Sequence, residues 1–183
     1  MGLYRARDLA TVPGLLSLSR IPLAACFPLA MGRPAVALGI LIAAGVSDVL
    51  DGWYARRFQQ VTATGTALDP VTDKIFVAAV ASTLVARGGL SVLDVVLLGT
   101  REIGELPLVA WIATSRAARR LRAKHPSANV PGKLATVFQF AAVTAAILRS
   151  PARDALVDLT AVAGVLAAAS YWARSLRQAR AAR

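Results

Sequence analysis

Four aspartates in one short stretch are the residues of this chain best suited to chemistry. Asp48 and Asp51 are three positions apart, and Asp69 and Asp73 are four apart. On helices, either spacing places two carboxylates on one face, with Cβ atoms about 5–6 Å apart. Like charges this close repel unless protons or cations lie between them. Hard cations such as Mg²⁺ and Mn²⁺ prefer oxygen ligands, so the pattern predicts a metal site in which four carboxylates could hold two ions.

The rest of the chain is apolar and basic. It has 183 residues, 56% of them hydrophobic, with 21 basic and 10 acidic side chains and a formal net charge of +11. The apolar residues gather in runs of roughly twenty, the length of a helix that crosses a bilayer. A nucleic-acid-binding protein would carry such charge on a polar domain, whereas here it lies in short segments between apolar runs. We therefore expect a single all-α integral membrane domain over residues 1–183 and no nucleic-acid partner.

The apolar runs predict about six transmembrane helices, with a polar active-site cavity at the cytoplasmic side. The second and third runs are short because the aspartates occupy their facing ends, so the helices should continue into the cavity. The third and fifth open behind Pro70 and Pro131, which the first turn of a helix tolerates. Gly88-Gly89 and Ser150-Pro151 predict tight connections. The six runs are Val12–Met31, Pro34–Val49, Val71–Ala86, Leu90–Ala113, Leu134–Leu148 and Ala155–Trp172.

The basic residues predict the orientation of these helices. With a cytoplasmic N-terminus, thirteen Lys and Arg residues fall inside and four fall outside, as the positive-inside rule requires. Both termini, the aspartates and the basic segment Arg116–Lys124 would then face the cytoplasm, in a multi-pass protein of the cytoplasmic (inner) membrane. That basic segment suits anchoring to anionic lipids.

The stretch from Asp48 to Asp73 reads D-x2-D-G-x2-A-R-x8-G-x3-D-x3-D. It resembles the signature of the CDP-alcohol phosphotransferase family, integral membrane enzymes of phospholipid synthesis. Thr11–Arg20 resembles the family's N-terminal segment N-x-P-N-x-L-T-x-x-R, with both asparagines replaced. Helix capping together with pairing to Arg56, Arg57 and Lys74 would account for one or two of the carboxylates but not for four arranged around paired glycines. The resemblance implies transfer from a CDP-linked donor to an alcohol, with release of CMP.

The resemblance also implies a role for each residue of the motif. The four aspartates would ligate two Mg²⁺ or Mn²⁺ ions, and Asp73 would remove the proton of the acceptor hydroxyl. Gly52 and Gly65 permit close backbone approach and would lie against the cytidine end of the donor, CDP-diacylglycerol. Arg56 would bind a phosphate oxygen of the nucleotide. For Gly52 alone, small-residue packing between membrane helices is the competing interpretation.

Two further segments resemble the phosphatidylglycerophosphate synthases of this family. Thr100-Arg101-Glu102 is similar to the Arg-Glu pair of their fourth helix, and Gly132–Gln139 is similar to their G-K-x-K-T-x-x-Q segment, with Ala135 in place of the second lysine. Arg101 and Lys133 are therefore the candidate ligands for a glycerol 3-phosphate acceptor. An internal Arg101–Glu102 ion pair and an interfacial Lys133 are the alternatives. With so few cations, phosphatidylglycerol, the acceptor of cardiolipin synthases, stays open, and an inositol phosphate suits the pattern less well.

The remaining expectations concern partners and the other classes of protein. The resemblance implies a homodimer in a lipid bilayer, and the small residues of Ala161–Ala169 suit helix packing of that kind. A divalent-metal transporter is the main alternative from another class. It would distribute polar residues across the depth of the bilayer, whereas this chain concentrates its aspartates at one end of the predicted helices.

Overall fold

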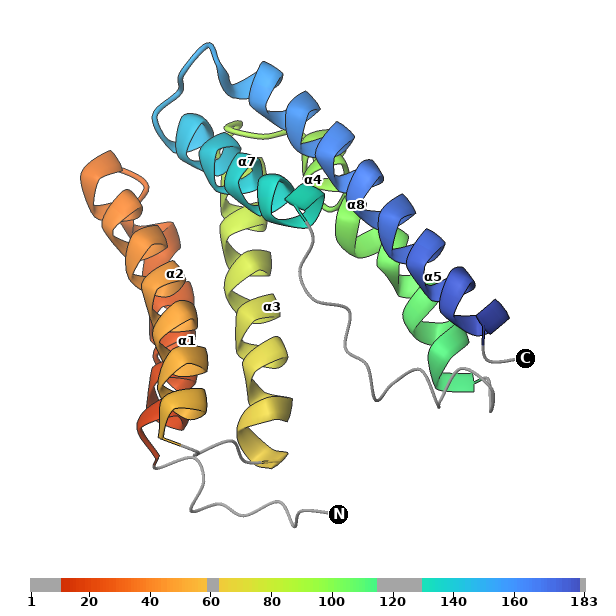
Figure 1. Ribbon diagram of the computed structural model, residues 1–183. Coiled ribbons are helices and arrows are strands. Elements are labelled where there is room, and N and C mark those ends of the chain that lie inside the picture. Colours follow the sequence, from red (N-terminus) through yellow and green to blue (C-terminus); the bar gives the residue numbers. More distant parts are fainter. Residues whose placement is uncertain (1–10, 59–62, 115–129, 182–183) are drawn as a thin grey trace. The chain divides into compact units, whose positions relative to one another are not determined.

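The computed structural model of the protein describes residues 11–58, 63–114 and 130–181, and within them every regular element is a helix (Figure 1). The chain divides into two compact units, Met1–Gly89 and Leu90–Arg183. The aspartate motif lies in the first unit, and Arg101 and Lys133 lie in the second. The expectation of one domain over 1–183 stays a prediction.

The first unit is built around its N-terminal helix. It contains α1 (Val12–Ala30), α2 (Pro34–Arg57) and α3 (Ala63–Ala86). α1 packs along both other helices, while α2 and α3 barely touch one another. Phe27 of α1 is fully buried and meets Phe76 of α3 edge to face, with ring centroids 6.4 Å apart. α1 therefore lies between α2 and α3 in the packing and provides most of the contacts of both helices.

The second unit is organised by its last helix. It contains α4 (Val92–Leu98), α5 (Thr100–Thr114), α7 (Val130–Ile147) and α8 (Arg153–Ala181). α8 packs against the other three. Glycines allow the closest of these approaches, because a Cβ added to Gly164 of α8 would lie 2.3 Å from Oγ1 of Thr100, and one added to Gly104 of α5 would lie 2.7 Å from Cβ of Ala168. Small residues of Ala161–Ala169 thus already serve packing within this chain.

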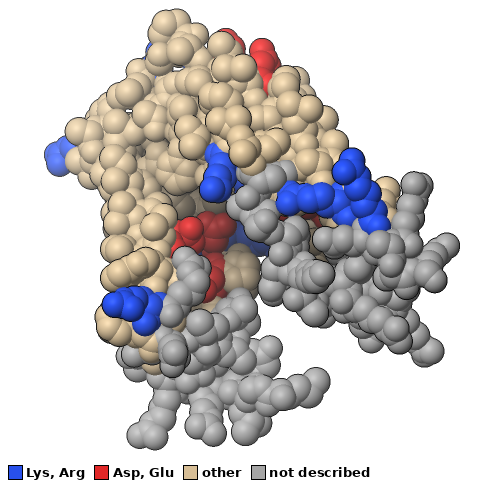
Figure 2. Space-filling view, viewed as in Figure 1, with Lys and Arg blue, Asp and Glu red and all other residues tan. Residues whose placement is uncertain are grey.

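The distribution of large and small side chains is that of a membrane protein. Alanine is the most frequent buried residue, as at Ala142 and Ala167, while large aliphatic residues such as Leu29 and Val92 are exposed. Among the residues drawn in colour in Figure 2, uncharged ones cover most of the face. Because lipid tails solvate aliphatic side chains, membrane helices associate through small residues and turn large ones outward. The protein is an all-α, multi-pass membrane protein.

The number of predicted spans needs a correction. Among the described helices, four are long and apolar enough to cross a membrane, namely Val12–Ala30, Pro34–Ala55, Val130–Ile147 and Arg153–Arg177. α3 has the length, but it carries Asp69, Asp73 and Lys74. The predicted span Leu90–Ala113 is divided at Gly99 into the short helices α4 and α5. The charged residues of α3 and the break at Gly99 therefore account for the difference between these four helices and the predicted six spans.

Several helix ends agree with local sequence signals such as caps and turns. Thr11 caps α1 by accepting a hydrogen bond from the Gly14 amide at 3.4 Å. After α3, Gly88 adopts a positive φ of 68°, the left-handed conformation that ends many helices. The tight turns expected at Gly88-Gly89 and Ser150-Pro151 are both present. Pro70, expected at the start of a helix, instead lies inside α3, which begins at Ala63.

Candidate active site

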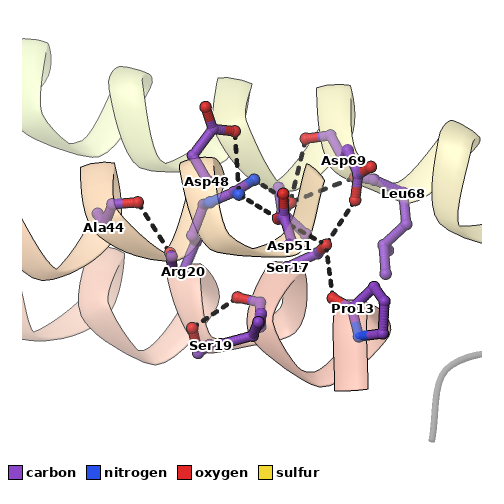
Figure 3. Close-up of polar contacts among 12 residues, drawn as sticks. Pro13, Ser17, Ser19, Arg20, Ala44, Asp48, Asp51, Leu68 and Asp69 are labelled. Carbon is purple, nitrogen blue, oxygen red and sulfur yellow. Dashed lines mark hydrogen bonds and ion pairs between the residues drawn. The ribbon is translucent and has the colours of Figure 1, made fainter. Parts of the chain in front are cut away.

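The structure gathers three of the four predicted aspartates around α1. Asp48 and Asp51 lie on α2, and Asp69 lies on α3. The Ser17 hydroxyl of α1 is 3.1 Å from Oδ2 of Asp51 and is hydrogen-bonded to Oδ1 of Asp69 (Figure 3). It also lies 3.0 Å from the carbonyl oxygen of Pro13. A hydroxyl donates one hydrogen at a time, so two carboxylates from different helices converge on a single donor.

Arg20, one turn after Ser17 on α1, is the cation of this cluster. Its side chain is only 1% exposed. Nη2 contacts Asp51 and lies 3.0 Å from Oδ1 of Asp48, and Nη1 lies 3.5 Å from Oγ1 of Thr72 on α3 (Figure 3). One guanidinium group therefore joins all three helices of the first unit.

The cluster extends from the interior to the surface. The Asp51 side chain is 5% exposed, whereas that of Asp48 is 58% exposed. Asp73, one helical turn after Asp69 on α3, is exposed. Its carboxylate therefore lies where a substrate could reach it, which the predicted role as a base requires.

The three clustered aspartates do not yet surround a common point. Within residues 11–58, 63–114 and 130–181, no three Asp, Glu, His or Cys side chains are arranged to hold one ion. Asp48, Asp51 and Asp69 instead meet through Arg20 and Ser17. The donor set nevertheless has the chemistry that Mg²⁺ and Mn²⁺ require, since every candidate ligand is a carboxylate oxygen. All three carboxylates are held to α1 by contacts between side chains.

The predicted nucleotide-binding residues occupy the same two helices. Gly52 follows Asp51 on α2 and is partly buried, and Gly65 lies in the first turn of α3. Arg56 lies in the last turn of α2, and its side chain is outside the described part of the structure. Their roles in nucleotide binding stay predictions.

The two predicted acceptor-binding residues lie together in the second unit. Nη1 of Arg101 on α5 donates hydrogen bonds to the carbonyl oxygen of Gly132, at 3.1 Å, and to Oγ1 of Thr136, at 2.7 Å. Nη2 forms an ion pair with Glu102 at 2.6 Å. Lys133 directly follows Gly132 and is exposed. Arg101 is thus oriented by α7, the helix that carries Lys133.

Two residues of the aspartate cluster were not predicted. Ser17 stands where the N-terminal pattern N-x-P-N-x-L-T-x-x-R has its threonine, three positions before Arg20 and so on the same helix face. Thr72 immediately precedes Asp73 and is fully buried. The signal for Ser17 was present in the sequence, because a polar residue beside a charged one on an apolar helix faces a polar partner. Thr72 lies three positions after Asp69 and carries the same kind of signal.

Comparison with known proteins identifies the family to which this chain is similar. The CDP-alcohol phosphatidyltransferase family matches residues 10–173. The chain is 46% identical over 81 residues to the CDP-diacylglycerol--glycerol-3-phosphate 3-phosphatidyltransferase of Pectobacterium atrosepticum, covering 42% of this chain and 44% of that one. It is 31% identical over 162 residues to the cardiolipin synthase (CMP-forming) of Streptomyces coelicolor, covering 84% and 72%. It is 34% identical over 172 residues to the cardiolipin synthase (CMP-forming) of Oryza sativa subsp. japonica, covering 81% and 50%.

The extent of the family match, across both units, identifies the class of protein. This chain belongs to the CDP-alcohol phosphatidyltransferase family, as the aspartate pattern indicated. The aligned stretches span about half the length of the Pectobacterium and rice proteins. The named relatives divide between two acceptors, glycerol 3-phosphate and the acceptor of cardiolipin synthases.

Proposed function

We propose that this protein transfers a phosphatidyl group from CDP-diacylglycerol to an alcohol and releases CMP. The observation that carries the proposal is the convergence of Asp51 of α2 and Asp69 of α3 on Ser17. This convergence brings the two halves of the family signature together although α2 and α3 barely touch. In the reaction, the acceptor oxygen bonds to the phosphatidyl phosphorus, the bond from that phosphorus to the CMP oxygen breaks, and the hydroxyl proton passes to a base.

We further propose that the activity depends on two Mg²⁺ or Mn²⁺ ions held by Asp48, Asp51, Asp69 and Asp73. When bound, such ions neutralise a pyrophosphate and stabilise the departing CMP. Asp73 accepts the hydroxyl proton, a role supported by its exposed position on α3. Gly52, Gly65 and Arg56 bind the nucleotide end of the donor. The support for these roles is the complete signature and the all-carboxylate donor set.

For the acceptor, we propose glycerol 3-phosphate, which would give phosphatidylglycerophosphate. Lys133 is exposed beside Gly132, to which Arg101 is hydrogen-bonded, and two such cations suit a phosphate monoester. Phosphatidylglycerol is the second candidate, because the relatives aligned over most of this chain are named cardiolipin synthases and because Glu102 offsets the charge of Arg101.

We also propose that the protein is a homodimer in the cytoplasmic (inner) membrane, with both termini in the cytoplasm. The excess of Lys and Arg in the segments assigned to that side supports the orientation. CDP-diacylglycerol would then enter from the same bilayer, and a water-soluble acceptor would enter from the cytoplasm. Support for the dimer is the family resemblance alone.

A single experiment tests the reaction and the acceptor together. Purified protein in mixed micelles receives CDP-diacylglycerol and Mn²⁺ with glycerol 3-phosphate, phosphatidylglycerol or inositol phosphate in separate reactions, and CMP and the lipid product are identified by mass. We expect CMP and phosphatidylglycerophosphate. Cardiolipin as the product would identify phosphatidylglycerol, the second candidate, as the acceptor. No CMP with any acceptor would contradict the proposed reaction.

A further inference from the structure

Arg20 contacts carboxylates that a bound metal ion would also need as ligands. Its Nη2 contacts both Asp48 and Asp51, two of the carboxylates proposed as metal ligands. Arginine keeps its charge at every pH at which a protein is folded. A guanidinium group 1% exposed in a membrane protein is therefore a permanent positive charge inside the carboxylate cluster.

The charge arrangement makes this arginine necessary when no ion is bound. Ser17 holds Asp51 and Asp69 close together, and Asp48 lies one turn from Asp51 on α2. Without a counter-ion, carboxylates this close repel each other or must take up protons. Because a buried charge that lacks its partner is strongly destabilising, Arg20 and the aspartates stabilise each other in the state described here.

The same arrangement leaves Arg20 incompletely bonded. Its Nε is buried and has no hydrogen-bond acceptor, and its contact with Thr72 is long, at 3.5 Å. An unsatisfied buried donor costs free energy, so this position is not the best that a guanidinium group could occupy. A structural arginine that served only to hold α1, α2 and α3 together would be expected to have all of its donors satisfied.

We propose that Arg20 is a built-in counter-cation of the metal-free site: it neutralises Asp48 and Asp51 when no ion is bound, and it competes with the incoming divalent ion for them. This inference rests on the metal dependence proposed above. Its consequence is reciprocal. Removing Arg20 should lower the stability of the metal-free protein and should raise its affinity for the metal ion, because binding and stability are linked.

The test measures thermal unfolding of the purified protein in detergent, in excess chelator and over a titration with Mn²⁺. The variants are Arg20→Met, which keeps a long side chain and removes its charge, and Arg20→Lys, which keeps the charge and loses the planar guanidinium group. Arg87→Met is the matched control, because Arg87 is an exposed residue at the end of α3. We expect Arg20→Met to have the lowest Tm in chelator and to be half-stabilised at about ten- to hundredfold less Mn²⁺ than the wild type, the effect of removing one charged hydrogen bond.

Arg20→Lys should fall between Arg20→Met and the wild type in both measurements, and it also provides the test if Arg20→Met does not fold. Arg20→Met combined with Asp51→Asn should recover Tm in chelator, because fewer carboxylates then remain unpaired. Weaker Mn²⁺ binding by the Arg20 variants, or no stabilisation of the wild type by Mn²⁺, would overturn the inference. CMP release is measured separately, so a protein that shows the expected Mn²⁺ linkage but transfers nothing would contradict the proposed reaction and leave the role of Arg20 standing.

Discussion

Nη1 of Arg101 lies 2.7 Å from Oγ1 of Thr136, and this hydrogen bond joins α5 to α7 beside Lys133. The same nitrogen donates to the Gly132 carbonyl. A substitution of Arg101 cannot separate this helix contact from the proposed binding of the acceptor, because it would disturb the contact as well as remove a charge. Lys133 is exposed on α7 and is the better residue with which to examine the acceptor.

We predict that Lys133→Ala raises KM for glycerol 3-phosphate about ten- to hundredfold, the effect of losing one charge-assisted contact. KM for CDP-diacylglycerol should change much less, because the donor motif lies in the first unit. Arg101→Ala should act in the same direction and also lower Tm. Steady-state kinetics with each substrate varied in turn provide the measurement, and Arg153→Ala, which removes a surface ion pair with Asp154, is the control. Unchanged acceptor kinetics in Lys133→Ala would favour a lipid acceptor.

The aspartates give a second prediction. Asp69→Asn and Asp73→Asn should each abolish CMP release without preventing membrane insertion, because asparagine keeps the shape of aspartate but loses its charge and its basicity. The exposed Asp158 of α8 supplies the control, and Asp158→Asn should retain activity. Full wild-type activity in excess chelator would contradict the proposed metal dependence.

The glycines of the second unit predict a packing effect. Gly164→Ala should destabilise the protein by about 1–3 kcal/mol, because the new methyl group overpacks the contact between α8 and α5. Its Cβ would lie 2.3 Å from Oγ1 of Thr100. Adding Thr100→Ala should recover part of the loss by removing that oxygen. Gly39→Ala on α2 is the control, since no atom lies within 4 Å of the added Cβ. Equal Tm values for Gly164→Ala and Gly39→Ala would contradict the close approach of α5 and α8.

A fourth prediction concerns topology. Reporter proteins fused after Arg183 and within residues 115–126 should both report the cytoplasm. These positions lie outside the described residues, but α7 and α8 lie between them and each is long enough to cross the membrane. Reporters on opposite faces would mean that one of the two helices does not span the bilayer.

The sequence predicted the reaction class and the helical fold better than it predicted the site's internal contacts. Spacing and the family pattern gave the four aspartates as site candidates, and three of them contact α1. Apolar runs predicted the starts of α1, α7 and α8 to within a few residues. The division at Gly99 escaped prediction because hydropathy does not report a break within an apolar run. Arg20 lies within the predicted span Val12–Met31, but the sequence does not indicate its partners, because Asp51 is 31 positions away. The Arg101–Thr136 contact was also hidden, since it depends on how α5 meets α7.

The position of Arg20 near the middle of α1 has a consequence for biosynthesis. α1 emerges from the ribosome before α2, and an arginine alone at the centre of a membrane helix costs about 2.5–3.5 kcal/mol on insertion scales. Its partners Asp48 and Asp51 arrive only with the end of α2, after a turn of three residues between Ala30 and Pro34. The two helices should therefore leave the translocon as a paired hairpin. Glycosylation-tagged nascent chains ending after α1 should integrate less efficiently than chains ending after α2.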